Sequence, residues 1–177
     1  MTDETGLFLK AIHFAAHKHK NHRRKDRKRT PYINHPIGVA MILNETANIN
    51  DQHILAAAVL HDTLEDTDTT FQELSETFSV KIATIVKEVS DDKSLPRNIR
   101  KQRQIETAPS LSYEARLIRI ADKINNLHDI TFSPPVFWSK KELKSYQDWA
   151  LEVVNSIRGT NTELEKLFDE TLNRARK

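Results

Sequence analysis

The chain has 177 residues, 38% of them hydrophobic and 29% charged, and a formal net charge of +2, a composition typical of a globular protein with one core. It contains no cysteine, which excludes disulfides and thiolate metal ligands and favours a reducing, cytoplasmic setting. Its three glycines provide no glycine-rich phosphate loop, and its longest apolar run is far shorter than the roughly 20 residues that span a bilayer. We therefore expect one soluble domain over residues 1–177.

Apolar residues recur at helical spacing almost throughout, beginning with a stripe from Leu7 to Ala16. Pro36 suits the first turn of a second helix, and residues 52–62 predict a third that is apolar on nearly every side and therefore central in the core. The same spacing predicts helices over 71–77, 79–90, 97–107, 113–130, 140–157 and 161–175. The predicted fold class is all-α, a compact domain of about eight to ten helices, with "TPYINH" at 30–35 as a briefly extended segment.

Three sequences of the form Ser/Thr-x-x-Glu predict capping boxes: "TFQE" at 70–73, "SKKE" at 139–142 and "TNTE" at 160–163. In such a box the first and fourth side chains each accept a hydrogen bond from a free backbone amide at the helix start. These sequences therefore predict where three of the helices begin.

The apolar run "ILAAAVL" at 54–60 is followed at once by "HDTLED", in which four of six side chains can bind a metal or transfer a proton. His61 and Glu65 are four residues apart, as are Asp62 and Asp66, so each pair shares a helix face if the helix continues that far. Buried carboxylates cost on the order of several kcal/mol each unless a cation meets them. A polar helix end with solvated carboxylates would explain this segment equally well when it is taken alone.

Two further residues extend this cluster. Asp122 lies beside the apolar stripe of "LIRIADKINNLHDI" at 117–130, and His35 lies in "YINHP". Singly, the aspartate is more often a buried network residue and the histidine an ordinary loop residue. Together with His61 and Asp62 they form a mixed nitrogen and oxygen ligand set, which suits Mn²⁺, Fe²⁺, Co²⁺, Ni²⁺ or Zn²⁺ rather than Ca²⁺.

Positive charge is concentrated in "KHKNHRRKDRKRT" at 18–30. The stretch could be a solvated face, a nucleic-acid patch or a clamp for a small polyanion. It contains no aromatic residue on which bases could stack, so nucleic-acid binding by this stretch is disfavoured.

The segments "RRKD", "TPYINHPIGVA", "AAAVLHDTLEDTDTT", "VSDDKSLP" and "RLIRIADKINNLHDI", in this order, closely resemble the HD-domain hydrolases of the RelA/SpoT alarmone family. The resemblance runs from about residue 7 to residue 172. It implies an all-helical HD domain that binds one Mn²⁺ and hydrolyses guanosine 3′,5′-bis(diphosphate) to GDP and pyrophosphate.

The resemblance also implies a role for particular residues. The metal ligands would be His35, His61, Asp62 and Asp122, with Glu65 and Asp66 activating the water. Nucleotide contacts would come from Arg24, Lys25, Arg97, Asn126 and Tyr146. The implied partner is a small nucleotide, with neither nucleic acid nor membrane bound, and the chain would be a monomer or a weak homo-oligomer.

Departures from the family pattern occur at Asn125, His128, Glu142 and the "RKR" at 27–29, and we expect them to affect nucleotide fit rather than chemistry. The remaining histidines, His19 and His22 among them, are interpreted as ordinary. Alternative functions are an NADPH 2′-phosphate phosphatase with the same site, a generic HD-type nucleotidase, or a basic RNA-binding or scaffold domain with a vestigial site.

Overall fold

The structure is a computed structural model that describes residues 4–177, and this part of the chain forms ten α-helices, one 3₁₀ turn and no strand. The helices are α1 Glu4–Lys18, α2 Asn34–Ala47, α3 Gln52–Leu60, α4 Thr63–Asp66, α5 Phe71–Thr77, α6 Val80–Val89, α7 Arg97–Thr107, α8 Tyr113–Phe132, α9 Lys140–Asn155 and α10 Thr162–Ala175. The 3₁₀ turn η1 covers Ala108–Ser110. The prediction of a compact all-α fold is confirmed, and no helix within the described range has the length and apolar character to cross a membrane.

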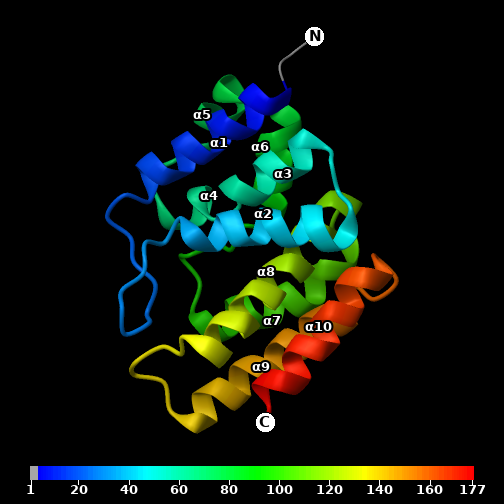
Figure 1. Cartoon of the computed structure of the whole chain (residues 1–177). Coiled ribbons are helices and arrows are strands. Elements are labelled where there is room, and N and C mark those ends of the chain that lie inside the picture. Colours follow the sequence, from blue (N-terminus) through cyan, green and yellow to red (C-terminus); the bar gives the residue numbers. More distant parts are fainter. Residues whose placement is uncertain (1–3) are drawn as a thin grey trace.

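The centre of the fold is α3, as its apolar sequence predicts. Every residue from Ile54 to Leu60 is buried, and the helix packs against α1, α2 and α6. Three consecutive alanines, Ala56 to Ala58, let these neighbours approach closely. Figure 1 shows α1, α3, α5 and α6 gathered at the N-terminal end of the molecule, with α7, α9 and α10 at the other end.

The second buried element is α8, which joins these two groups. It packs against α2, α6, α9 and α10, and its buried residues include both the predicted stripe and the polar pair Asp122 and Lys123. Gly38 on α2 faces Asn125 on α8 so closely that a Cβ at this glycine would lie 2.5 Å from the Asn125 amide nitrogen. The glycine therefore sets how near α2 and α8 can come.

The segment after α3 is more irregular than one continuous helix over 52–62. Helix α3 ends at Leu60, where the Thr63 hydroxyl donates to the Leu60 carbonyl at 2.7 Å, and α4 begins at Thr63. His61 and Asp62 keep right-handed helical backbone angles between the two helices. The metal- and proton-binding side chains of this segment therefore project from a helix end and a turn.

The three predicted capping boxes have three different outcomes. The box at 139–142 is complete, with Ser139 and Glu142 each accepting from the other's backbone amide. At 70–73 only Thr70 caps, because Glu73 pairs with Lys18 at 3.0 Å. The consequence for Lys18 is that it holds α1 to α5 instead of lying free in solvent.

The box predicted at 160–163 is wrong by one residue. The N-cap of α10 is Asn161, whose side chain accepts from the Leu164 amide at 3.0 Å. Glu165 accepts from the backbone amides of Gly159 and Asn161, while the Thr160 hydroxyl donates backward to the Ile157 carbonyl. Asparagine is as good an N-cap as threonine or better, and here Glu165 completes the reciprocal bonding that the sequence pattern assigned to Glu163.

Two loops close one side of the molecule. The segment between α1 and α2 holds the basic stretch and forms a single antiparallel β-bridge between Arg23 and Pro31, the only trace of the expected extended segment within residues 4–177. The α8–α9 connector, residues 133–139, meets this loop where the Val136 amide donates to the Lys25 carbonyl at 3.0 Å. Figure 1 shows both loops projecting on the same side of the helices.

Asn161→Ala should lower the free energy of unfolding by about 1 kcal/mol, because the Leu164 amide loses its acceptor. Urea denaturation followed by far-UV circular dichroism measures the change. Glu163→Ala is the matched control and should have a smaller effect, since the structure gives this glutamate no capping bond. A larger loss in Glu163→Ala than in Asn161→Ala would contradict the observed cap.

Candidate active site

Two imidazoles from different helices approach one another in the interior. His35 is in the first turn of α2 and His61 follows α3; both are buried, and their ring centroids are 5.2 Å apart. His35 Nδ1 lies 2.7 Å from the Asn125 amide oxygen, and His61 Nδ1 lies 2.7 Å from the Ala58 carbonyl. These acceptors fix the proton on Nδ1 of each ring, so both Nε2 atoms present a lone pair to the same region.

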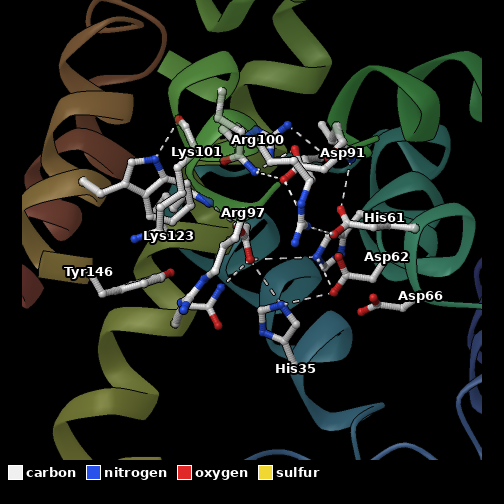
Figure 2. A pocket seen from close by; sticks show the side chains of 18 of the residues that line it. His35, His61, Asp62, Asp66, Asp91, Arg97, Arg100, Lys101, Lys123 and Tyr146 are labelled. Carbon is white, nitrogen blue, oxygen red and sulfur yellow. Dashed lines mark hydrogen bonds and ion pairs between the residues drawn. The ribbon is translucent and has the colours of Figure 1, made fainter. Parts of the chain in front are cut away.

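Two carboxylates face these Nε2 atoms. Asp62 Oδ2 lies 3.7 Å from His35 Nε2 and 3.1 Å from His61 Nε2. Asp122 Oδ1, from α8, lies 3.2 Å from His35 Nε2 and 3.9 Å from His61 Nε2. Figure 2 shows His35, His61 and Asp62 directed toward one another.

This cluster fits a divalent metal ion. His35, His61 and Asp62 can each offer one ligand atom within 4.8 Å of the others, and Asp122 adds an oxygen beside both imidazoles. Ligands about 2.1 Å from one ion lie roughly 3 to 4 Å apart, which matches the four distances above. His61 Nε2 is also buried and has no hydrogen-bond partner in the described part of the chain, as expected of a ligand atom. A divalent metal ion is therefore the group that these residues suit.

The charges in the cluster are strongly coupled. Burial opposes the charged imidazolium of His61, but the carboxylates of Asp62 and Asp122 outweigh it and raise the pKa of His61 to about 9. Burial likewise opposes ionisation of Asp122, yet the Lys123 ammonium, 2.9 Å away, and His35 hold its pKa well below the usual range. The carboxylates of the cluster thus favour positive charge beside them, which a bound cation would also supply.

Glu65 lies beside the cluster in a different electrostatic state. Burial, followed by the negative charges of Asp91, Asp62 and Asp66, raises the pKa of Glu65 to about 7, although the Asp91 amide donates to its Oε2. A carboxyl group with a pKa near neutrality can accept and release a proton at physiological pH. The structure therefore gives Glu65 the properties of an acid–base group.

Asp66 is linked to the cluster through Tyr32. The Tyr32 hydroxyl donates to Asp62 Oδ2 at 2.5 Å and lies 3.3 Å from Asp66 Oδ2, and Lys93 pairs with the same Asp66 carboxylate. Behind Tyr32 lies His19, which is 2% exposed and stacks on the phenol ring at 4.8 Å. His19, interpreted from the sequence as ordinary, is thus a core residue that supports the site.

The residues expected to contact the nucleotide differ in whether their side chains are already bonded to other residues of the protein. Arg24 Nη2 donates to Asn126 Oδ1 at 2.7 Å and to Asp129 at 2.6 Å, and Asn126 donates to Asp122 Oδ1 at 2.6 Å. Arg24 and Asn126 are therefore part of a bonded chain that ends on Asp122. Lys25, by contrast, is exposed and forms no ion pair among residues 4–177.

All the predicted residues border two connected hollows. A polar cleft of about 290 Å³ is lined by the four cluster residues and by Glu65, Asp66, Arg24, Lys25, Arg97, Asn126 and Tyr146. A wider hollow of about 600 Å³ continues from it toward Asp129 and Pro135. Their size suits a nucleotide. Glu142 borders neither hollow, since its carboxylate caps α9 through Ser139.

Sequence reasoning missed several residues that this geometry brings to the site. Asn125 was expected to affect nucleotide fit, but its amide oxygen bonds the ring of His35. Tyr32 and Arg100 were not singled out; Arg100 lies 3.3 Å from Glu65 Oε1. The only signal for Tyr32 is its position three residues before His35, in the turn that leads into α2. Asn125 and Arg100 gave no signal, because long-range packing decides their contacts.

Comparison with known proteins defines the class first. The family model of the HD domain matches residues 11–147, most of the chain. Curated relatives named guanosine-3′,5′-bis(diphosphate) 3′-pyrophosphohydrolase MESH1 are 49% identical in Danio rerio, over 94% of this chain and 92% of the relative, and 48% identical in Homo sapiens, over 94% and 93%.

A solved structure extends the match to three dimensions. It is described as a metazoan ortholog of SpoT that hydrolyzes ppGpp, is 43% identical, covers 95% of this chain and 94% of its own, and superposes with a TM-score of 0.92. The chain therefore belongs to the HD-domain family and, within it, to the group of MESH1 relatives. The family resemblance drawn from the sequence is confirmed.

Asn125→Leu should weaken metal binding by about 10- to 100-fold, because the His35 Nδ1–H loses the acceptor that orients its ring. Titration of the metal-free protein with Mn²⁺ by calorimetry measures the affinity. Asn44→Leu, on the exposed face of α2, is the control and should bind metal as the wild type does. Unchanged affinity in Asn125→Leu would show that the bond to His35 has no such role.

Proposed function

We propose that this protein hydrolyses guanosine 3′,5′-bis(diphosphate) to GDP and pyrophosphate, with Mn²⁺ held by His35, His61, Asp62 and Asp122. The observation that carries the proposal is the convergence of two Nε2 atoms and two carboxylates inside a polar cleft, each pair 3.1 to 3.9 Å apart. The relatives named for this activity, and the solved ortholog described as hydrolysing ppGpp, support the choice of substrate.

A bound divalent ion supplies a Lewis acid that polarises a phosphoryl oxygen and lowers the pKa of a water molecule. The residues of this chain do the remaining work. Glu65 accepts the proton of the attacking water, as its pKa near 7 permits. The water oxygen bonds to the proximal phosphorus of the 3′-pyrophosphate as the bond from that phosphorus to the ribose 3′ oxygen breaks. The 3′ oxygen takes up a proton, and pyrophosphate leaves intact.

Lys93 lies beside Glu65 and pairs with Asp66. The Tyr32 hydroxyl contacts both Asp62 and Asp66 and so fixes their relative positions. On the nucleotide side, Asn126 donates to Asp122, and Arg24 donates in turn to Asn126. We propose that they position the ribose, while Lys25, exposed at the mouth, attracts the phosphates.

Asp62→Ala should reduce turnover by at least about 100-fold, because it removes one of four ligand atoms, and should leave the far-UV circular dichroism near that of the wild type. Release of pyrophosphate from guanosine 3′,5′-bis(diphosphate) with Mn²⁺ is the assay. Asp68→Asn removes an exposed carboxylate six residues away and should keep full activity. Full activity in Asp62→Ala would remove the metal-dependent mechanism.

Orthophosphate release from NADPH in the same assay tests the alternative substrate. A wild-type protein that hydrolyses NADPH and leaves the guanosine nucleotide intact would replace the proposal with the phosphatase alternative. Salt-dependent binding of RNA oligonucleotides without hydrolysis of either nucleotide would instead favour a binding domain.

The pH dependence should follow Glu65. Its ionised form is the base, so kcat/KM should rise with pH up to about 7 and then level off. A cation bound nearby favours the ionised form of Glu65 and lowers its pKa, so it can only move this rise in kcat/KM to lower pH. Glu65→Gln should lose both most of the turnover and the rise, whereas Glu76→Gln on the surface of α5 should keep both. A rise that persists in a still active Glu65→Gln variant would assign the base elsewhere.

A further inference from the structure

Cations are gathered on the side of the cleft that lies away from the catalytic carboxylates. Figure 2 shows Lys101, Lys123 and Tyr146 on the opposite side of the view from His61, Asp62 and Asp66. These side chains come from α7, α8 and α9, and all of them line the polar cleft. The cleft thus has an acidic half, in which Arg100 pairs with Glu65, and a basic half formed by Lys101, Lys123 and Arg97.

The cations of the basic half lie against aromatic rings, and of the three only Lys123 also pairs with a carboxylate in the described part of the chain. Lys101 Nζ lies 4.7 Å from the ring centroid of Trp149, Lys123 Nζ lies 4.3 Å from the same centroid, and the Arg97 guanidinium lies 5.8 Å from that of Trp138. The Trp149 indole nitrogen donates to the Lys101 carbonyl at 3.0 Å, which fixes α7 to α9 at this point. Ring faces hold cations in place without neutralising them.

Neither Arg97 nor Lys101 forms an ion pair within residues 4–177, and Lys123 pairs only with Asp122. Burial, followed by the charges of Arg97 and Lys123, lowers the pKa of Lys101, so the cations are close enough to repel one another. Such crowding costs free energy unless an anion enters between them.

The basic half also contains a buried hydroxyl group, that of Tyr146. Tyr146 is 9% exposed and lines the cleft, and its hydroxyl has no well-formed hydrogen bond within residues 4–177. Arg119 also lines this cleft, and its buried Nε likewise has no hydrogen-bond partner within the described residues. Buried polar atoms are nearly always satisfied, so unpartnered donors that border one cleft indicate a polar ligand there.

The position of the basic half relative to the metal cluster indicates which part of the ligand would bind there. Lys123 Nζ contacts Asp122 Oδ2 at 2.9 Å, while Asp122 Oδ1 faces His35 Nε2 at 3.2 Å. The ammonium is therefore one carboxylate away from the proposed metal ion. In a pyrophosphate ester whose proximal phosphorus reacts at the metal, the distal phosphate is the anionic group next to that phosphorus and can reach an ammonium placed in this way.

We propose that Lys101 and Lys123, with Arg97 and the Tyr146 hydroxyl, form a subsite for the distal phosphate of the 3′-pyrophosphate. This inference rests on the proposed function, and it assigns the residues that distinguish the substrate from other nucleotides. A nucleotide with a single phosphate at the reacting position leaves the subsite without its anion. The subsite therefore favours pyrophosphate esters over monophosphate esters, including a nicotinamide nucleotide 2′-phosphate.

The test compares two nucleotides that differ only in the distal phosphate: guanosine 3′,5′-bis(diphosphate) and guanosine 5′-diphosphate 3′-monophosphate. Their affinities are measured by calorimetry with Mn²⁺-loaded Glu65→Gln protein, so that neither is turned over. Adding Lys101→Met should weaken binding of the bis(diphosphate) at least tenfold and binding of the monophosphate less than threefold. Lys101 is the chosen position because it touches no metal ligand.

Lys140→Met, which removes an exposed lysine at the start of α9 that lines neither hollow, is the matched control and should change neither affinity. Lys101→Gln repeats the test with a polar side chain, and thermal denaturation verifies that each variant is folded. Equal losses for both nucleotides would mean that Lys101 contributes only a general field or binds the 5′-diphosphate, which overturns the proposal.

No loss in either Lys101 variant overturns it as well, as does a reference protein that binds the two nucleotides equally or binds neither. Failure of the proposed function is a separate result, namely absence of pyrophosphate release by the wild type with its glutamate intact. The two affinities decide on the subsite whichever way that assay ends.

Discussion

The site depends on the fixed orientation of two imidazole rings. A histidine can bind a metal through either ring nitrogen, and only an acceptor on Nδ1 commits Nε2 to that role. Here one acceptor is the side chain of Asn125 on α8, and the other is the backbone of Ala58 in α3. The position of the proposed ion is therefore set by the packing of α2, α3 and α8, the most deeply buried part of the fold.

The charges around this point are unevenly distributed. Carboxylates lie on the side formed by the α3–α4 turn, where Lys93 and Arg100 pair with them, and the cations Arg97 and Lys101, unpaired among the described residues, lie on α7. A ligand with several negative charges and one metal-bound group can enter such a field in only one orientation at low energy. The aromatic rings beneath the cations matter because carboxylates in their place would cancel the field.

Prediction from the sequence succeeded where a local pattern determines the outcome. Helical spacing gave α5 and α7 with their observed bounds, and the apolar sequence of α3 placed it in the core. The choice of His35 and Asp122 beside His61 and Asp62 came from ligand chemistry and family resemblance, and the fold brings these four side chains together. Their roles, and those of Glu65 and the nucleotide contacts, stay predictions.

What the sequence could not show depends on contacts between distant segments. Glu73 pairs with Lys18 of α1 and therefore does not complete the capping box at the start of α5. Asn125 contacts His35 because Gly38 allows α2 to approach α8 closely. The basic half of the cleft was likewise hidden, since Lys101, Lys123 and Trp149 belong to three helices and show no common motif.

The end of α3 at Leu60 has a consequence for attempts to make this protein more robust. Carbonyls in the last turn of a helix have no helical partner, which is why that of Ala58 can accept from His61. Substitutions that extend the helix through residues 61 and 62 would improve its regularity and withdraw that acceptor. Heat resistance gained in this turn would thus come with impaired catalysis, and thermostable versions are better sought in α10 or the surface loops.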